Sequence, residues 1–170
     1  LLLLGGGGHR TGKSGDGWRD LEAFARKEFP GAAVQARWAA QDCMSLDGVP
    51  YIGPYSRHTP DFFVATGFNK WGMTSSMVAA RLLTDRILRR PNPCTALFAP
   101  PRSLLHPRLA GNLLSATIHL LRPSRPRCPH MGCALHWNAA EQCWECPCHG
   151  SRFDAEGNVL DAPAAHGLRR

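Results

Sequence analysis

Residues 128–151 read CPHMGCALHWNAAEQCWECPCHGS, and this stretch decides how the C-terminal part of the chain folds. It begins with CPHMGC at 128–133 and ends with CPCHGS at 146–151, so each end offers one thiolate and one imidazole. The residues between the two motifs are enough for a short hairpin that brings the motifs face to face. Two sulfur and two nitrogen ligands suit one tetrahedral zinc ion. They also suit two irons, with the cysteines on one iron and the histidines on the other.

Both motifs resemble, in order and spacing, the two boxes of the Rieske family, C-x-H-x-G-C and C-P-x-H-G-S. Residues 152–164 are similar to the continuation of that family. The resemblance implies a [2Fe–2S] cluster with four ligands: Cys128, His130, Cys146 and His149. It also implies a disulfide between Cys133 and Cys148, and a hydrogen bond from Ser151 that tunes the cluster. A zinc finger would explain the four ligands but neither the extra cysteine in each motif nor Gly150-Ser151, so we favour iron.

The position two residues after the serine bears on the reduction potential. Two neutral imidazoles in place of two thiolates raise the potential above that of an all-cysteine ferredoxin. Many high-potential members of the Rieske family carry tyrosine at this position, whereas this chain has Phe153. Because phenylalanine has no hydroxyl to donate, we expect a lower potential than in the tyrosine-bearing relatives.

Composition narrows the class of protein. The chain has 170 residues, 44% of them hydrophobic, and a formal net charge of +7, which suggests one or two small domains. The sequence contains no basic run interleaved with aromatic residues, so nothing in it predicts a nucleic-acid partner. No signal peptide and no apolar run of membrane-spanning length is visible. The scattered remainder of the seven cysteines argues against a secreted disulfide scaffold, and we expect a cytoplasmic location. Because the chain starts without methionine, we interpret it as a C-terminal fragment.

An N-terminal motif suggests nucleotide binding. Residues 7–14, GGHRTGKS, fit the phosphate-binding P-loop, and the leucines at 1–4 predict a buried strand end before it. A P-loop must lead straight into a helix, but Gly15, Asp16 and Gly17 follow here, and glycine is costly in a first helical turn. Nucleotide hydrolysis is therefore not our interpretation.

Apolar periodicity predicts the regular elements of the rest of the chain. We expect helices over 18–29, 73–90 and 109–121, and extended segments over 32–40, 49–53 and 62–66. Asp16 is the expected N-cap of the first helix, and Thr74 or Ser75 that of the second.

Residues 65–74, ATGFNKWGMT, form a strand, a glycine loop and a helix start. Together with WAAQD at 38–42 and PYIG at 50–53, they resemble the C-terminal part of FAD-dependent oxidoreductases of the D-amino-acid-oxidase type. In that family this loop lies against the flavin, and members with an appended Rieske domain are known. The cofactor-binding positions carried over are Gly67, Phe68, Lys70, Trp71, Gly72, Met73 and Thr74. The alternative is a plain strand-to-helix turn with Trp71 in the core.

Two features depart from these families. The dinucleotide fingerprint G-x-G-x-x-G is absent, so the adenine and pyrophosphate half of FAD has no binding residues here. A Rieske domain usually has several strands before its first ligand motif, whereas the linker at 122–126 leads almost directly to Cys128.

We therefore predict an α+β fold in three parts. Residues 1–100 are the remnant of an α/β FAD-binding domain with strands and a long helix, 101–124 a helix and linker, and 125–170 a small all-β Rieske-type domain. The resemblances imply FAD-dependent oxidation of a small amine or amino-acid-like substrate, with the cluster exchanging electrons with a redox partner or an N-terminal FAD domain. The alternatives are a stand-alone electron-transfer module and a zinc-stabilised binding domain. No catalytic base can be named; Asp42, Asp47 and Lys70 are candidates by location alone.

Overall fold

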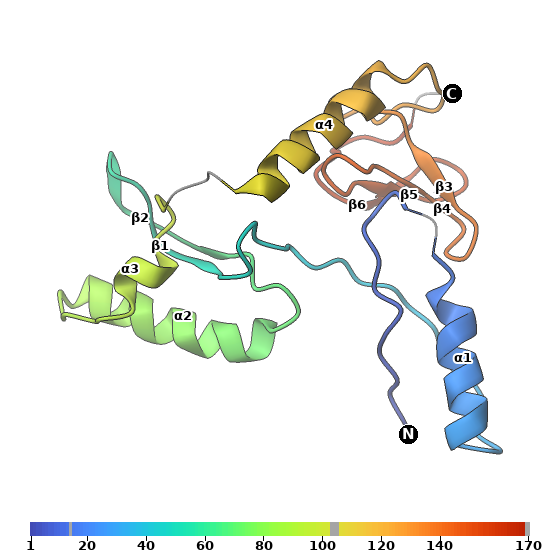
Figure 1. The fold of residues 1–170 in the computed structure, drawn as a ribbon, viewed down its shortest axis with the longest axis horizontal. Helices are drawn as coiled ribbons and strands as arrows, with labels where there is room; N and C mark the ends of the chain where they lie inside the picture. The colour runs from blue at the N-terminus through green and yellow to red at the C-terminus, as the bar shows by residue number, and fades with distance from the viewer. Residues whose placement is uncertain (14, 103–105, 169–170) are drawn as a thin grey trace. The chain divides into compact units, whose positions relative to one another are not determined.

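The structure is a computed structural model that describes residues 1–13, 15–102 and 106–168. Ser14, which ends the P-loop pattern, residues 103–105 of the predicted linker, and residues 169–170 lie outside the described ranges. The chain divides into two compact units, one made of Leu1–Ala39 with Asn112–Arg170 and the other of Ala40–Gly111. The helices and strands of both units are shown in Figure 1.

A β-hairpin and a long helix form the unit of residues 40–111. Strands β1 (Tyr51–Ser56) and β2 (Thr59–Thr66) pair antiparallel. Helix α2 (Gly72–Ile87) packs Ala79 and Leu82 against Ile52 of β1, and the short helix α3 (Thr95–Phe98) adds Phe98 to this core. The two predicted strands and the long helix are confirmed. The predicted cap is wrong, because α2 already begins at Gly72 after Trp71, with no side-chain cap.

An ion pair joins the start of this unit to its end. Arg102 donates from Nε to Asp47 Oδ2 at 2.6 Å and from Nη2 to Asp47 Oδ1 at 2.9 Å. Its guanidinium also lies 3.9 Å from the ring centroid of Tyr51. The hydrogen bonds from Arg102 hold the pKa of Asp47 well below its usual range. Asp47 is therefore a structural carboxylate and is poorly suited to accept a proton, so it is no longer a candidate base.

A small antiparallel sheet organises the other unit. Its four strands are β3 (His136–Asn138), β4 (Cys143–Glu145), β5 (Arg152–Phe153) and β6 (Val159–Asp161), and they lie in that order. Strands β3 and β4 form the predicted hairpin between the two cysteine motifs. Trp137 and Trp144 lie opposite each other across this hairpin, with ring centroids 5.1 Å apart. The hairpin therefore sets the spacing of the two motifs.

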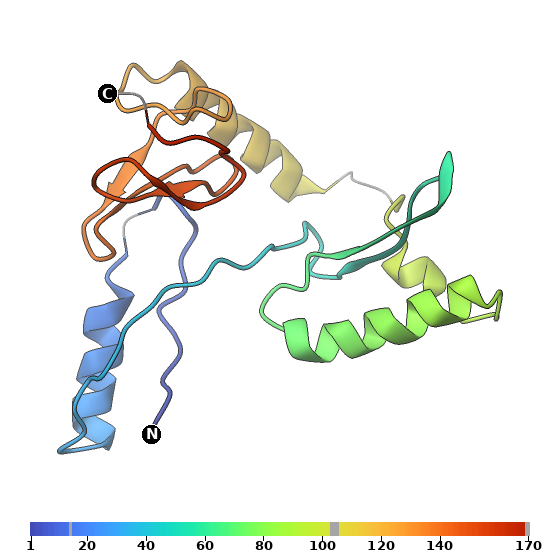
Figure 2. The ribbon, with the colours of Figure 1, turned by 180° about the vertical axis from the view of Figure 1, so that it is seen from behind.

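Two helices contribute to the same unit. Helix α1 (Gly17–Glu28) confirms the first predicted helix, and the Asp16 carboxylate accepts a hydrogen bond from Arg19 N at 3.2 Å, as expected of its N-cap. Helix α4 (Pro107–Leu121) confirms the third, and its residues from 112 onward belong to this unit. Figures 1 and 2 show this part of α4 beside the small sheet. In the described ranges, none of the helices is long and apolar enough to cross a membrane.

Two predicted segments are not strands. The leucines at 1–4 and the segment at 32–40 form no strand, and Leu3, Val34 and Trp38 are 72%, 54% and 62% exposed. A strand needs a partner for its backbone N–H and C=O groups, and neither segment pairs with another within the described residues. Alternation of apolar side chains alone was thus not enough to predict a strand.

The core of the sheet unit consists largely of residues from the cysteine motifs. Phe153 is fully buried and packs with Leu135 and Ala164 and with the motif cysteines Cys128, Cys133 and Cys146. The predicted α+β fold class is confirmed, with its β-rich part centred on these cysteines.

Candidate metal centre and the 67–74 loop

The two cysteine motifs fold into loops with the same hydrogen-bond pattern. In the first ligand loop (residues 128–133), Cys128 N donates to Cys133 O at 2.9 Å and Gly132 N to Cys128 O at 2.8 Å. In the second ligand loop (residues 146–151), Cys146 N donates to Ser151 O at 2.8 Å and Gly150 N to Cys146 O at 3.0 Å. Each loop is thus a turn closed by hydrogen bonds to the backbone of its own first cysteine, and the two loops share this backbone conformation.

The four predicted ligands divide into a buried pair and an exposed pair. Cys128 and Cys146 are each 1% exposed and pack in one core. His130 and His149 are exposed, and their ring centroids lie 5.0 Å apart with an interplanar angle of 83°. The structure therefore brings sulfur together on the inner side and nitrogen on the outer side, which is the donor arrangement that two irons need.

The thiol of Cys128 is held in a polar setting despite its burial. Burial raises its pKa above the ordinary value, whereas hydrogen bonds from the His130 backbone and the Ser151 side chain act to lower it. Ser151 is fully buried, and its Oγ accepts a hydrogen bond from Ala164 N at 3.0 Å. The Ser151 hydroxyl thus lies between the Ala164 backbone and the Cys128 thiol, and its predicted tuning of a cluster stays a prediction.

The spacing of the donor atoms bears on the choice between one ion and two. Ligand atoms on one tetrahedral zinc lie within about 4 Å of one another. Among the described residues, the groups of at least three ligand atoms within 4.8 Å are Cys133–Cys146–Cys148 and His9–Glu141–Glu145, and neither contains three of the four predicted ligands. No three of the four predicted ligands therefore gather within 4.8 Å in the described part of the chain, and the ligand set stays a prediction.

The predicted disulfide partners lie close together. Cys133 and Cys148 are free thiols in the structure, and their sulfur atoms lie within 4.8 Å of each other and of Cys146. Burial raises the pKa of Cys148 far above its ordinary value, and the thiol of Cys133 adds to the rise. The Cys133–Cys148 pairing stays a prediction.

Helix α4 supports the first ligand loop where strands were expected. Ala134 N donates to His119 O of α4 at 2.8 Å. Arg127 donates to three carbonyls: from Nη1 to Leu120 O at 3.1 Å and to Gly132 O at 2.6 Å, and from Nη2 to Arg122 O at 2.8 Å. Arg127 thus joins the end of α4 to the loop that starts at Cys128. The sequence did not reveal this role, because nothing distinguishes Arg127 from the other two arginines of the proline-containing stretch at 122–127.

A buried charged network lies under the second ligand loop. Arg152 forms ion pairs with Glu141, Glu145 and Asp161, and Asn138 Nδ2 donates to Glu145 Oε1 at 2.9 Å. Cys143, which lies in neither cysteine motif, is fully buried, and Arg152 Nη2 lies 3.4 Å from its sulfur. The network fixes the orientation of Glu145, the residue directly before Cys146.

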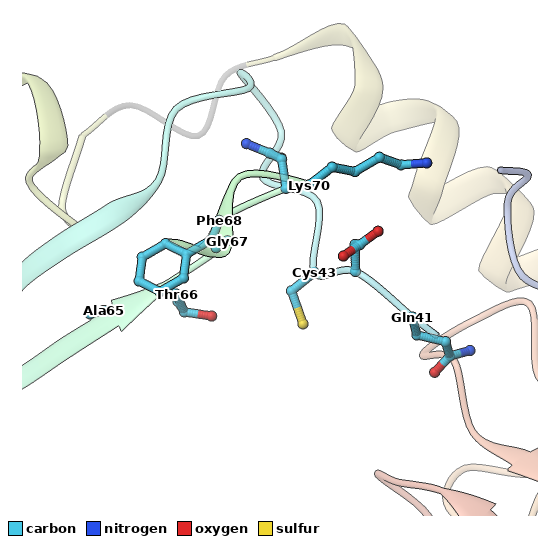
Figure 3. Close-up of a pocket in the computed structure, with 10 residues that line it drawn as sticks. Gln41, Cys43, Ala65, Thr66, Gly67, Phe68 and Lys70 are labelled. Atoms are coloured by element: carbon cyan, nitrogen blue, oxygen red, sulfur yellow. The ribbon is translucent and has the colours of Figure 1, made fainter. Parts of the chain in front are cut away.

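The 67–74 loop borders an open pocket of about 320 Å³ in the other unit (Figure 3). Of the predicted flavin contacts, Gly67, Phe68, Lys70 and Gly72 line the pocket, and so does Asp42. The other three, Trp71, Met73 and Thr74, lie outside its lining.

The exposure of the helix start bears on one detail of the plain-turn alternative, the predicted burial of Trp71. Trp71 and Met73 are 72% and 88% exposed, so Trp71 does not belong to the core and the plain-turn alternative is wrong on that point. The Asn69 side chain ties the loop to residues 45–48: Ser45 N donates to Asn69 Oδ1 at 3.1 Å, and Asn69 Nδ2 donates to Gly48 O at 3.0 Å. The result is a braced backbone loop with exposed apolar side chains beside it.

Comparisons with known proteins find a family for each part of the chain. The family model described as FAD dependent oxidoreductase matches residues 1–86, and the one described as Rieske [2Fe-2S] domain matches residues 119–170. The chain belongs to the FAD-dependent oxidoreductases and carries a Rieske [2Fe–2S] domain at its C-terminal side. The two domains imply FAD and a [2Fe–2S] cluster as cofactors.

Two relatives illustrate these matches. One relative is YhfW of Bacillus subtilis strain 168, which is named as a Rieske 2Fe-2S iron-sulfur protein. Its alignment with this chain is 215 residues long and 32% identical, and it covers 100% of this chain and 42% of YhfW. The cytochrome b6-f complex iron-sulfur subunit 1 of Nostoc sp. is 54% identical over 41 residues, which cover 24% of this chain and 23% of that subunit. The chain thus spans less than half the length of the relatives that it matches.

Proposed function

We propose that the native protein couples a FAD-dependent oxidation of a small amine or amino-acid-like substrate to one-electron transfer through a Rieske cluster. Residues 1–100 would contribute to the flavin domain and residues 125–170 to the cluster domain. The cluster ligands would be Cys128, His130, Cys146 and His149. The observation that carries the proposal is the burial of both cysteines beneath a pair of exposed histidines.

The protein contributes position and electrostatics to this chemistry. A bound flavin accepts two electrons as a hydride equivalent, and a bound [2Fe–2S] cluster exchanges one electron at a time. Burial raises the pKa of the Cys128 thiol, so this cysteine would release its proton on binding iron. The exposed imidazole edges of His130 and His149 give a redox partner access to the outer end of the site. The 67–74 loop offers backbone and apolar surface to a flavin ring.

Metal and sulfide analysis of the native protein, purified without oxygen, tests the cluster. We expect two irons and two acid-labile sulfides per chain, with an electron paramagnetic resonance signal after reduction. One zinc per chain without iron would contradict the proposal, and would favour a zinc-stabilised domain.

Anaerobic addition of amines and amino acids tests the flavin half. Bleaching of the flavin absorbance followed by appearance of the reduced-cluster signal is the expected result. If the cluster instead responds only to a reduced partner protein and no substrate bleaches the flavin, the protein is an electron-transfer module without substrate chemistry.

A further inference from the structure

The loop of residues 9–13 lies directly on the second ligand loop. Gly12 N donates to Glu145 Oε2 at 2.7 Å. A Cβ built on Gly12 would lie 2.4 Å from Pro147 Cβ and 2.8 Å from Pro147 Cα, closer than real Cβ atoms approach other atoms. Gly12 also has a φ of +80°, which side-chain-bearing residues rarely adopt. Both the space and the backbone conformation at position 12 therefore require glycine.

The groups that Gly12 contacts are themselves fixed. Glu145 is 3% exposed, and its other carboxylate oxygen accepts from Asn138 Nδ2 at 2.9 Å. Pro147 is buried and lies in sequence between Cys146, a proposed ligand, and Cys148. Since neither contact can move freely, a displacement at position 12 is passed to the backbone of the second ligand loop.

The contact between the 9–13 loop and the second ligand loop joins parts of the chain that match two different families. The loop falls within the part of the chain that matches the FAD-dependent oxidoreductase family, whereas Glu145 and Pro147 fall within the Rieske match. Figures 1 and 2 show the N-terminal segment reaching the small sheet, and both belong to one compact unit. The P-loop-like pattern at 7–14 therefore includes a glycine with a structural use other than phosphate binding.

We propose that the 9–13 loop is the docking contact between the flavin-family part of the chain and the cluster, with Gly12 as a positioning residue for the second ligand loop. The proposal rests on the proposed function, because Cys146 and His149 must hold the cluster for the contact to matter. On this proposal, the 9–13 loop holds the second ligand loop against the part of the same chain that matches the FAD-dependent oxidoreductases.

A pair of glycine variants tests the positioning role in the native protein. Gly12→Ala introduces both the unfavourable φ and the contact with Pro147. Gly31→Ala is the matched control, because Gly31 has a φ of +90° but no atom within 4 Å of an added Cβ. We expect Gly12→Ala to release iron to a chelator about tenfold faster than wild type, because changes that displace the residues supporting metal ligands commonly weaken metal binding about tenfold or more. We also expect a shifted reduction potential and an altered resonance line shape, with the control unchanged in all three.

A second variant separates the contact from the backbone strain. Asparagine tolerates positive φ better than alanine, so Gly12→Asn retains the clash with Pro147 at a lower backbone cost. The altered potential and line shape should persist in Gly12→Asn and be absent from Gly31→Asn. Equal potentials and line shapes in the Gly12 and Gly31 variants would overturn the positioning role.

Hydrogen exchange in the wild-type protein tests the docking without any substitution. The Gly12 amide should exchange slowly in the cluster-loaded protein and faster after removal of the cluster. Rapid exchange at Gly12 in both forms would overturn the docking contact. If the wild-type protein holds no cluster at all, it is the proposed function that fails, and iron analysis shows this before any variant is made.

Discussion

The two ligand loops and the 67–74 loop are short segments of similar length, but they differ in what surrounds them. Cys128 and Cys146 are each 1% exposed, whereas Trp71 and Met73 are 72% and 88% exposed. The ligand loops are held by a hairpin and a helix that are their near neighbours in sequence. A dinucleotide site, in contrast, gathers groups from distant strands and loops. Loops held by their neighbours in sequence can therefore be well packed in a chain whose 67–74 loop is exposed.

The largest expected effect comes from removing a buried ligand. Cys146→Ser should abolish the iron, the visible absorbance and the resonance signal, because a serine hydroxyl is a poor ligand for ferric iron in place of a thiolate. Cys143→Ser is the control, since Cys143 is equally buried but lies in neither ligand motif. Iron content measured on both variants checks the prediction; loss of iron from both, or from neither, would contradict the ligand assignment.

Next in size is the ion pair that braces the unit of residues 40–111. Asp47→Asn should lower the free energy of unfolding by about 1.5 kcal/mol, the lower end for hydrogen bonds to a charged group, because the Asp47 side chain is 32% exposed and solvent screens the pair. Because Arg102 lowers the pKa of Asp47 in the folded state, the stabilisation is present above the ordinary pKa of the carboxyl. This stabilisation is lost as the pH falls towards the lowered pKa that Asp47 has in the folded state.

Urea denaturation at neutral and acidic pH measures this difference. The gap between wild type and Asp47→Asn should shrink in acid. Asp61→Asn, at an exposed position of β2, serves as the control and should change little. A gap that stays constant with pH would show that the carboxylate charge is not responsible.

A smaller change is expected at the fully buried Phe153. Phe153→Tyr adds a hydroxyl in the core that contains both buried ligand cysteines. If the hydroxyl donates to sulfur more strongly in the reduced state, a hydrogen bond worth about 1 kcal/mol raises the one-electron potential by about 40 mV. Voltammetry of the two proteins measures the shift, and an unchanged midpoint potential would refute the account of why this chain has phenylalanine.

The smallest expected change concerns the exposed start of α2. Met73→Ala should change the free energy of unfolding by less than about 0.5 kcal/mol, because the side chain is mostly in solvent. Leu82→Ala on the buried side of the same helix should cost about 2–5 kcal/mol. Thermal unfolding compares the two variants; a large loss at Met73 would mean that this surface is covered in solution.

The cluster site was the part most open to prediction from sequence. The hairpin between the motifs and the helices depend on local sequence order, and the structure contains them. The strand predicted at 32–40 failed because its pairing depends on a partner that alternation does not reveal. The contacts of Gly12 with Glu145 and of Arg127 with the end of α4 join residues through tertiary packing, so no sequence pattern pointed to them.

The hydrogen bonds between α4 and the first ligand loop have a consequence for biosynthesis. A helix leaves its last carbonyls without partners inside the helix, and here His119 O and Leu120 O are satisfied by Ala134 and Arg127. Since a chain emerges from the ribosome N-terminus first, α4 is made before Cys128 and Cys146. The first ligand loop thus has its anchoring point on a helix that leaves the ribosome before it does, so this half of the predicted site can form without help from the second ligand loop.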